Sequence, residues 1–293
     1  MNSTQQWQNV TWFEVDEHQD GQRIDNFLFS RLKGVPKSRI YRLIREGQVR
    51  VNKKRIKAET KLAIGDQIRV APIRYEQKDE SAAPVSDKVA QGLLARVIYE
   101  DEGLMVVNKP SGIAVHGGSG VAYGLIEGLR AATGKKYLEL IHRIDRDTSG
   151  LVMISKKRST LKTLQDLLRE HKIQKTYAAI VKGQVSLDKQ LIDAPLHRYE
   201  LANGERRVRV SKEGKASKTQ WNVAERFMHA SLVYASPLSG RTHQIRVHGL
   251  SIGHPLVGDD KYGHQTEYRG PAPRRLCLHA MRLEIPGYPV IEA

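Results

Sequence analysis

The first part of the chain changes from a helical to an extended pattern of apolar residues over a short distance. In residues 23–33 apolar side chains recur at helical spacing, which predicts a helix. A second helix is predicted from Ser38, whose hydroxyl can cap it, to about Gly47. Short alternating stretches at 48–52 and 67–70 then predict strands. These elements together indicate a small α+β unit.

This unit is expected to span about residues 12–75, and a different pattern follows it. Residues 76–90 contain small and charged residues with little apolar content, which is typical of an exposed linker. Beyond them strands are predicted at 104–107, 151–155, 177–182, 230–236 and 276–284, and helices at 122–132 and 159–169. Strands outnumber helices without a regular βαβ rhythm, so residues 91–293 are expected to form an α+β domain with a mixed, largely antiparallel sheet.

Composition places the chain among globular proteins and excludes several other classes. Its 293 residues, 40% hydrophobic and 27% charged, suggest about two domains. The single Cys277 excludes an internal disulfide framework and argues against a thiolate zinc site. No apolar run approaches the roughly 18–20 residues that span a bilayer, and the N-terminus lacks a signal-type core. A soluble, cytoplasmic protein without a membrane partner is expected.

The formal charge of +16 concerns the partners of the protein and not its fold. Residues 31–57 hold eleven lysines and arginines against one acid, Glu46, which gives +10 within 27 residues. Apolar Ile40, Leu43 and Ile44 interleave with the basic positions at helical spacing. We therefore expect a folded basic surface that binds the phosphates of a nucleic acid.

The N-terminal pattern resembles the S-four (αL) RNA-binding domain. The matching segments are Arg23-Ile24-Asp25, Ser38-Arg39, 43–49, Val51-Asn52 and Gly65-Asp66. In that family the two helices and the following turn face the RNA backbone. The resemblance implies that Arg39, Arg42, Arg45, Lys53 and Lys54 contact phosphates.

Common catalytic motifs are absent from the sequence. It has no P-loop, dinucleotide-binding or nucleophile-elbow signature, and His243 and His248 lack the spacing of a helical zinc pair. Residues 141–151 instead place Asp145 between Arg143 and Arg146, before a turn-forming Thr-Ser-Gly and an apolar strand. The nearby positive charge favours the ionised carboxylate, and the turn would present it at a sheet end. This indicates carboxylate chemistry without a metal.

Five segments of the chain resemble motifs of the RluA-type pseudouridine synthases, in the order expected along the sequence. These are Asn108-Lys109-Pro110-Ser111-Gly112 with His116, the Asp145 segment, Lys175-Thr176-Tyr177, the segment 237–248 that contains Arg241 and Arg246, and 253–259 with Tyr262-Gly263. The likeness covers about residues 91–285, and its overall plan is most similar to the RluC type, which acts on large-subunit ribosomal RNA. By this resemblance further sequence would be expected after Ala293.

The resemblance implies a role for each matching residue. Asp145 corresponds to the catalytic aspartate, Tyr177 to the aromatic residue against the target base, and Arg241 to the basic partner of the aspartate. Arg143 corresponds to the arginine that fills the gap left by the flipped base, and Arg246 is an alternative partner of the aspartate or a pocket contact. His142, Lys109 and His243 are further candidate substrate contacts.

The chemistry implied by the resemblance requires few groups. Converting uridine to pseudouridine involves no net redox change or hydrolysis, so no cofactor is expected. One carboxylate can act either as a nucleophile or by removing a sugar proton, and the sequence leaves both routes open. The target must be flipped out of its stack. A monomer acting on ribosomal RNA or a pre-ribosomal particle is expected. A non-catalytic RNA-binding protein is the main alternative, and a metal-dependent RNA hydrolase a remote one.

Overall fold

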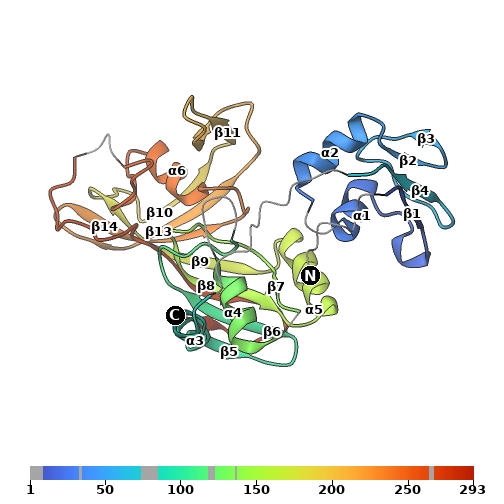
Figure 1. The fold of residues 1–293 in the computed structure, drawn as a ribbon. Helices are drawn as coiled ribbons and strands as arrows, with labels where there is room; N and C mark the ends of the chain where they lie inside the picture. The colour runs from blue at the N-terminus through green and yellow to red at the C-terminus, as the bar shows by residue number, and fades with distance from the viewer. Residues whose placement is uncertain (1–8, 33–34, 74–84, 118–122, 136, 264–266) are drawn as a thin grey trace. The chain divides into compact units, whose positions relative to one another are not determined.

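The chain forms two compact units, Met1–Ser81 and Ala82–Ala293, in a computed structural model (Figure 1). The structure describes residues 9–32, 35–73, 85–117, 123–135, 137–263 and 267–293. Most of the predicted linker lies outside these residues. In the described ranges no helix is both long and apolar enough to cross a membrane.

The first unit is a small α+β fold. It contains β1 (Thr11–Glu14), η2 (Glu17–Gln19), α1 (Ile24–Arg31), α2 (Lys37–Arg45), β2 (Val49–Val51), β3 (Lys54–Arg55) and β4 (Gln67–Val70). The antiparallel strands are ordered β1-β4-β2-β3. Apolar faces of the two helices meet the sheet in a core that includes Phe27, Leu43 and Ile68. The helical and strand patterns of the sequence are thus confirmed here.

The start of the second helix differs from the prediction. The cap residue is Pro36 instead of Ser38, and no side chain caps the helix. Proline has its φ fixed near the extended value that precedes a helix, so the chain turns into the helix earlier than a serine signal indicates. The helix ends before Gly47, which has a positive φ of 71°.

The second unit is built around one large sheet. Its elements are α3 (Asp87–Leu94), β5 (Val97–Glu100), β6 (Leu104–Lys109), α4 (Leu125–Thr133), β7 (Glu139–Leu140), β8 (Ser149–Ser155), α5 (Arg158–Arg169), β9 (Gln174–Lys182), β10 (Lys189–Asp193), β11 (Leu196–Glu200), β12 (Arg206–Val210), β13 (Lys218–Arg226), β14 (Ala230–Pro237), α6 (Gln244–Ser251), β15 (Leu278–Glu284) and β16 (Ile291–Glu292). All five strands and both helices predicted after residue 91 have observed counterparts.

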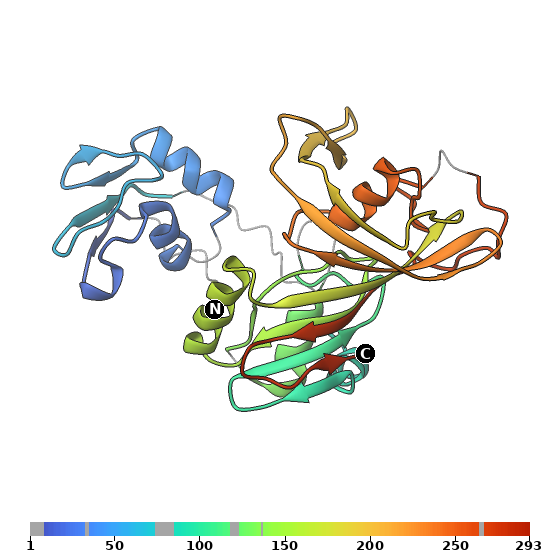
Figure 2. The same ribbon diagram turned by 180° about the vertical axis from the view of Figure 1, so that it is seen from behind.

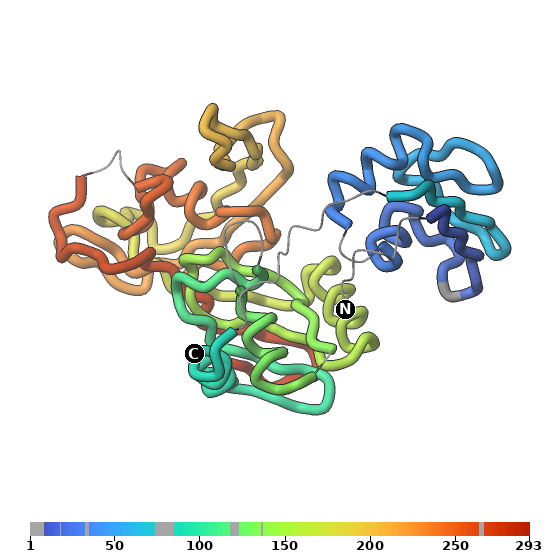
Figure 3. Tube along the Cα trace, viewed as in Figure 1, coloured from blue at the N-terminus to red at the C-terminus, as the bar shows by residue number. Residues whose placement is uncertain are grey.

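The large sheet is mixed and mostly antiparallel, as predicted. Its main path runs β10-β13-β14-β9-β15-β8-β6-β5, with β7 and β16 paired to its side. Only β8 and β15 pair in parallel among the described strands, and they lie side by side although they are far apart in sequence (Figure 3). The hairpin of β11 and β12 forms a separate two-stranded sheet.

Strands β6 and β8 are covered on both faces. Met105 and Val107 of β6 belong to the core under α4, whereas Leu104 and Val106 belong to the core under α5 (Figures 1 and 2). Successive strand residues point to opposite faces, so double coverage requires the continuous apolar run seen in the sequence.

Helix α3 packs against α4 and begins at Asp87, inside the predicted linker, because its apolar residues recur at helical spacing.

Candidate active site

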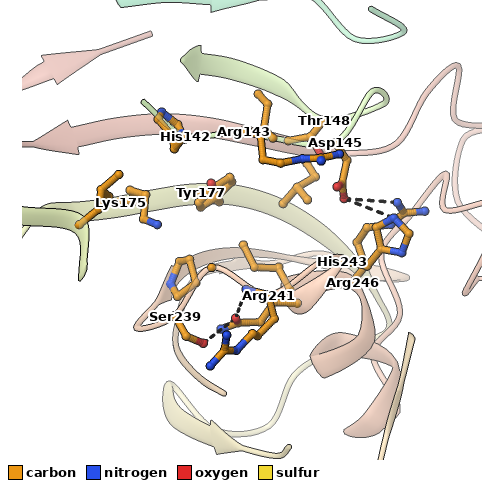
Figure 4. A pocket seen from close by; sticks show the side chains of 17 residues that line it. His142, Arg143, Asp145, Thr148, Lys175, Tyr177, Ser239, Arg241, His243 and Arg246 are labelled. Atoms are coloured by element: carbon orange, nitrogen blue, oxygen red, sulfur yellow. Dashed lines mark hydrogen bonds and ion pairs between the residues drawn. The ribbon is translucent and has the colours of Figure 1, made fainter. Parts of the chain in front are cut away.

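A pocket of about 330 Å³ opens in the second unit around the predicted aspartate (Figure 4). The loop between β7 and β8 contributes Asp145, strand β9 contributes Tyr177, and the segment that leads into α6 forms the opposite wall. The residues that line it are His142, Arg143, Ile144, Asp145, Thr148, Leu168, Lys175, Tyr177, Pro237, Ser239, Gly240, Arg241, His243, Gln244, Ile245, Arg246 and Leu278. Sequence segments about 100 residues apart therefore meet in one cavity.

The backbone after Asp145 is shaped by Gly150. This glycine has a φ of 110°, and a Cβ atom there would lie 2.2 Å from the carbonyl oxygen of Ala280. Only glycine permits both the dihedral angle and the close approach of β15. The structure has no turn at the Thr-Ser-Gly segment, because Ser149 and Gly150 already belong to β8. Gly150 thus allows the parallel pairing of β8 with β15 and fixes the end of the aspartate loop.

Lys109 supports this loop from behind. Its ammonium group donates to the backbone carbonyls of Pro110 (2.8 Å), Ile113 (2.8 Å) and Arg146 (3.0 Å). The side chain is fully buried, and burial lowers its pKa to about 8. It does not line the pocket, so the prediction that Lys109 contacts substrate is corrected: its donors are used to hold two loops together.

Asp145 meets a buried ion pair. Its Oδ2 atom lies 3.6 Å from Nη1 of Arg246, and the side chain is 23% exposed. Arg246 donates from Nε and Nη2 to the two carboxylate oxygens of Asp259, both at 2.7 Å. The amides of Lys261 and Tyr262 also donate to Asp259 at 3.0 Å. These contacts hold the guanidinium in one orientation while one of its nitrogens faces Asp145.

The charges of this pair are stabilised despite burial. Burial alone would lower the pKa of Arg246, but the hydrogen bonds and charge of Asp259, with Asp145, raise it. Burial alone would raise the pKa of Asp259, but Arg246 and two backbone amides lower it. Both groups therefore stay ionised at neutral pH, and Asp145 faces a permanent positive charge.

Arg241 does not pair with the aspartate, contrary to the first of the two predicted arrangements. Its side chain is exposed at the pocket edge, and its Nε donates to the carbonyl of Ala216 at 3.3 Å. The backbone amide of Arg241 donates to Oε1 of Gln244. Arg246 is the partner of Asp145. It lies in the first turn of α6, and its side chain points toward the loop that contains Asp145.

His243 forms a second contact with Asp145. Its Nε2 lies 3.8 Å from Oδ2 of Asp145, and its Nδ1 lies 2.7 Å from the hydroxyl of Tyr262. The ring of Tyr262 lies under the Arg246 guanidinium, 5.1 Å from it. Burial lowers the pKa of His243, with the charge of Arg246 adding to this and that of Asp145 opposing it. The histidine is consequently a neutral neighbour of the aspartate at pH 7.

The remaining predicted residues occupy different parts of the pocket. Tyr177 is buried, and burial together with the charge of Asp145 raises the pKa of its phenol, which keeps the hydroxyl protonated. Arg143 is exposed and lines the opening. His142 lines the wall, but its Nε2 accepts the backbone N–H of Met153 at 3.0 Å, so that nitrogen is not available to substrate. Burial lowers the pKa of His142 to about 3.

Several residues of the site were not predicted. Gln244 uses both ends of its amide: Oε1 accepts from Ser239 (2.7 Å) and the Arg241 amide (3.1 Å), and Nε2 donates to the carbonyl of Lys218 (2.9 Å) and the hydroxyl of Thr219 (3.0 Å). Asp259 and Tyr262 lie in a segment of the resemblance without an assigned role. An acidic residue between glycine-containing turns was the only sequence signal for Asp259.

The predicted RNA contacts of the first unit occupy helix α2 and the hairpin of β2 and β3. Arg45, Lys53 and Lys54 are exposed, Arg39 is half-buried, and Arg42 pairs with Glu46 at 2.6 Å. The turn has positive φ angles at Asn52 and Lys53. The Asn52 amide holds this turn by donating to Asp66 at 2.7 Å and accepting from the Gln67 amide at 2.9 Å.

No group of three or more potential metal ligands is found among the described residues. Of the two histidines that line the pocket, His142 accepts from a backbone amide, and His243 contacts Tyr262 and Asp145. The site is thus a cavity with a carboxylate, a fixed guanidinium and an aromatic ring.

Comparisons with known proteins identify the family to which the chain is similar. The RNA pseudouridylate synthase profile matches residues 103–251, and the S4 domain profile matches residues 22–68. The chain is 52% identical over 285 residues to ribosomal large subunit pseudouridine synthase C of Yersinia pestis, covering 95% of this chain and 89% of that protein. It is also 52% identical to the protein of that name from Escherichia coli K12, covering 90% and 85%. A solved structure of human RNA pseudouridylate synthase domain containing 1 superposes with a TM-score of 0.57 at 27% identity, covering 67% and 81%.

Proposed function

The chain belongs to the RNA pseudouridylate synthase family and is a pseudouridine synthase, and from this premise we propose that it isomerises specific uridines of large-subunit ribosomal RNA. The names of the relatives and the S4 domain support this substrate. We further propose that the enzyme acts as a monomer. Free ribosomal RNA and an assembling ribosomal particle are both compatible with this proposal. The enzyme is proposed to act in the cytoplasm.

The reaction exchanges one bond of the uracil ring for another. The N1–C1′ bond breaks, the base turns, and a C5–C1′ bond forms. The hydrogen of C5 leaves to solvent, and N1 gains a proton. Atoms and electrons therefore balance within the nucleotide and water.

Asp145 is proposed to start this exchange. It can attack C1′ as a nucleophile or remove the proton of C2′, and both routes need an ionised, oriented carboxylate. The contact of Asp145 with Arg246, which Asp259 holds in place, is the single observation that carries the proposal. A preorganised charge in a partly enclosed pocket acts more strongly than the same charge in water.

The target base is proposed to enter the pocket after flipping out of its stack. A base inside a helix hides its sugar and glycosidic bond, so extrusion must precede the chemistry. Tyr177 offers an aromatic face for the uracil beside Asp145, and exposed Arg143 at the opening is suited to fill the space that the nucleotide leaves. The protonated phenol of Tyr177 can donate to a carbonyl of the base.

The S4 domain is proposed to bind the RNA backbone through the basic helix and turn. Arg39, Arg45, Lys53 and Lys54 provide the positive charge, while Arg42 is already shared with Glu46. Phosphate contacts of this kind position the substrate without selecting the target uridine.

A tritium-release assay tests the proposed function. Large-subunit ribosomal RNA transcribed with C5-labelled uridine is incubated with the wild type and with Asp145→Asn. We expect the wild type to release tritium and the variant to lose turnover by at least about 10³-fold, because no other group replaces the carboxylate. RNA binding by the variant should stay within about twofold, since the carboxylate contributes no attraction to phosphate.

Two outcomes would contradict the proposal. Turnover that survives Asp145→Asn would remove this aspartate from the mechanism. Tight binding without turnover on any ribosomal RNA would favour a non-catalytic RNA-binding protein. Mapping the product then identifies the modified uridines.

A further inference from the structure

One lysine of the pocket has no partner of its own. Lys175 precedes Tyr177 by two residues on β9, so both side chains point to the same face of the sheet and both line the pocket (Figure 4). Among the residues that the structure describes, no acid or carbonyl pairs with its ammonium group, and burial lowers its pKa. Lys109, by contrast, has three carbonyl partners. The Lys175 side chain is half-buried in the pocket wall, and a cation without a partner at such a place marks a position where an anion is expected.

Lys175 also lines a second cavity next to the first. This second cavity has a volume of about 440 Å³ and shares Leu168, Lys175, Pro237, Ser239 and Gly240 with the first. The two volumes are each in the range that holds a small ligand. These five residues form a wall between the two cavities. A nucleic-acid strand that occupied both cavities would cross this wall.

The second cavity has surfaces suited to a nucleobase. Its apolar residues include Ile173 and Leu238, which can cover the face of a ring. Gln174 and Gln220 add amide groups. The Nε2 of Gln220 donates to two backbone carbonyls at 3.1 and 3.2 Å, which fixes its amide and leaves Oε1 as an acceptor. An apolar cavity with a few fixed polar groups is typical of a ligand site.

We propose that Lys175 binds the phosphate between the target uridine and an adjacent nucleotide, and that the second cavity receives that neighbouring nucleotide. The inference rests on the proposed function and deepens it, because it assigns a subsite for substrate selection outside the target pocket. When the target nucleoside fills the first cavity and its neighbour the second, the linking phosphodiester must cross the shared wall. The unpaired ammonium group of Lys175 lies in that wall.

A chemical double-mutant cycle tests the phosphate contact. A ribosomal RNA fragment that the wild type modifies is made with a neutral methylphosphonate 5′ or 3′ to the target uridine, or two linkages away as a control. Binding is measured with Asp145→Asn, in which the target stays unmodified, and with Asp145→Asn carrying Lys175→Met. Methionine keeps the length and packing of the side chain but removes its charge.

We expect the neutral linkage at one of the two adjacent positions to weaken binding about tenfold when Lys175 is present. Lys175→Met should weaken binding of the unmodified RNA by a similar factor and show no further loss with the neutral linkage. The slope of log affinity against log salt should decrease by about 0.7, the value for one contact to a single strand. Lys175→Arg should retain the slope and the coupling.

Lys172→Met is the matched control. Lys172 lies three residues earlier, is exposed, and pairs with Glu170 at 2.8 Å. We expect this variant to keep both the affinity and the loss caused by the neutral linkage. Should Lys175→Met fail to fold, as judged by circular dichroism, Lys175→Gln carries the same test.

The second cavity is tested with an abasic nucleotide next to the target on the side that couples to Lys175. We expect binding to weaken several-fold there and to stay unchanged with an abasic nucleotide on the other side. Equal binding of both RNAs would overturn the assignment of this cavity to a nucleotide.

The contradicting outcomes are separable from a failure of the proposed function. The phosphate contact would be overturned if the loss caused by Lys175→Met and the loss caused by the neutral linkage multiplied at every linkage tested. An unchanged salt slope would overturn it as well. Either result would indicate that Lys175 bonds to a carbonyl of the base. If the wild type modifies ribosomal RNA but the cycle shows no coupling, only this inference fails. If the wild type modifies no ribosomal RNA, the proposed function fails and this inference with it.

Discussion

The two units use positive charge in opposite ways. In the S4 domain, Lys53 on a turn and Lys54 at the start of β3 are exposed, and their charges face solvent. In the catalytic unit, Lys109 and Arg246 are buried, and the hydrogen-bond donors of each are directed at fixed oxygen atoms. Basic residues of one sequence therefore serve two purposes, attraction of a polyanion and the positioning of a carboxylate.

The difference follows from solvent. An exposed cation is screened by salt and costs little to place, so its effect on binding is small and depends on ionic strength. A buried cation is tolerated only with partners, and its removal leaves those partners unsatisfied. The predictions below test this contrast from the largest expected effect to the smallest.

Arg246→Met should have the largest effect because it leaves Asp259 buried without a counter-charge. We expect the free energy of unfolding to fall by about 3–5 kcal/mol and turnover to be lost. Urea unfolding and tritium release measure the two effects. Arg241→Met, at the exposed edge, should cost less than about 1 kcal/mol. Equal losses for the two variants would contradict the assignment of Arg246 as the partner of Asp145.

Lys109→Met should come next, because three backbone carbonyls lose their shared donor. We expect the free energy of unfolding to fall by about 1–3 kcal/mol. Turnover should decrease through kcat, since the carbonyl of Arg146 helps to hold the aspartate loop. Lys162→Met on the exposed side of α5 is the control and should change stability by less than about 0.5 kcal/mol. A change in KM alone for Lys109→Met would instead favour a substrate contact.

The third prediction concerns pH and His142. Burial lowers its pKa from 6.5 to about 3, so between these values the unfolded chain binds a proton that the folded chain does not. Stability should therefore fall as pH falls, with His142 contributing up to about 1.4 kcal/mol per pH unit. Urea unfolding at pH 6 and pH 5 should show a smaller loss for His142→Gln than for the wild type. Identical losses would mean that the folded protein admits the proton.

Single substitutions at the exposed turn should have the smallest effects. Lys53→Ala and Lys54→Ala should each change the free energy of unfolding by less than about 0.5 kcal/mol. Each should reduce the slope of log RNA affinity against log salt by the amount expected for about one phosphate contact. Each should leave kcat unchanged. Lys189→Ala, on exposed β10 of the other unit, is the control. An unchanged salt slope for both turn variants would show that this turn does not contact RNA.

Amphipathic helices and continuously apolar strands were predictable, whereas a helix buried nearly all round and a polar edge strand were missed. Helix α2 was found because Ile40, Leu43 and Ile44 alternate with basic residues. Helix α6 was missed because it is buried nearly all round and includes Arg246 and His248, so no apolar stripe distinguishes it. Strand β10 was missed because its exposed edge carries polar residues that weaken the alternation.

The sequence by itself determined the α+β class, the basic segment 31–57 and the presence of Asp145 and Tyr177 in motifs of one family. These depend on local spacing, which hydrophobic burial and turn chemistry impose on neighbouring residues. Only the tertiary structure decided that Arg246 and not Arg241 meets Asp145, that Lys109 binds backbone carbonyls, and that Lys175 borders two cavities. Such contacts join residues distant in the chain, and the packing of strands and helices fixes them.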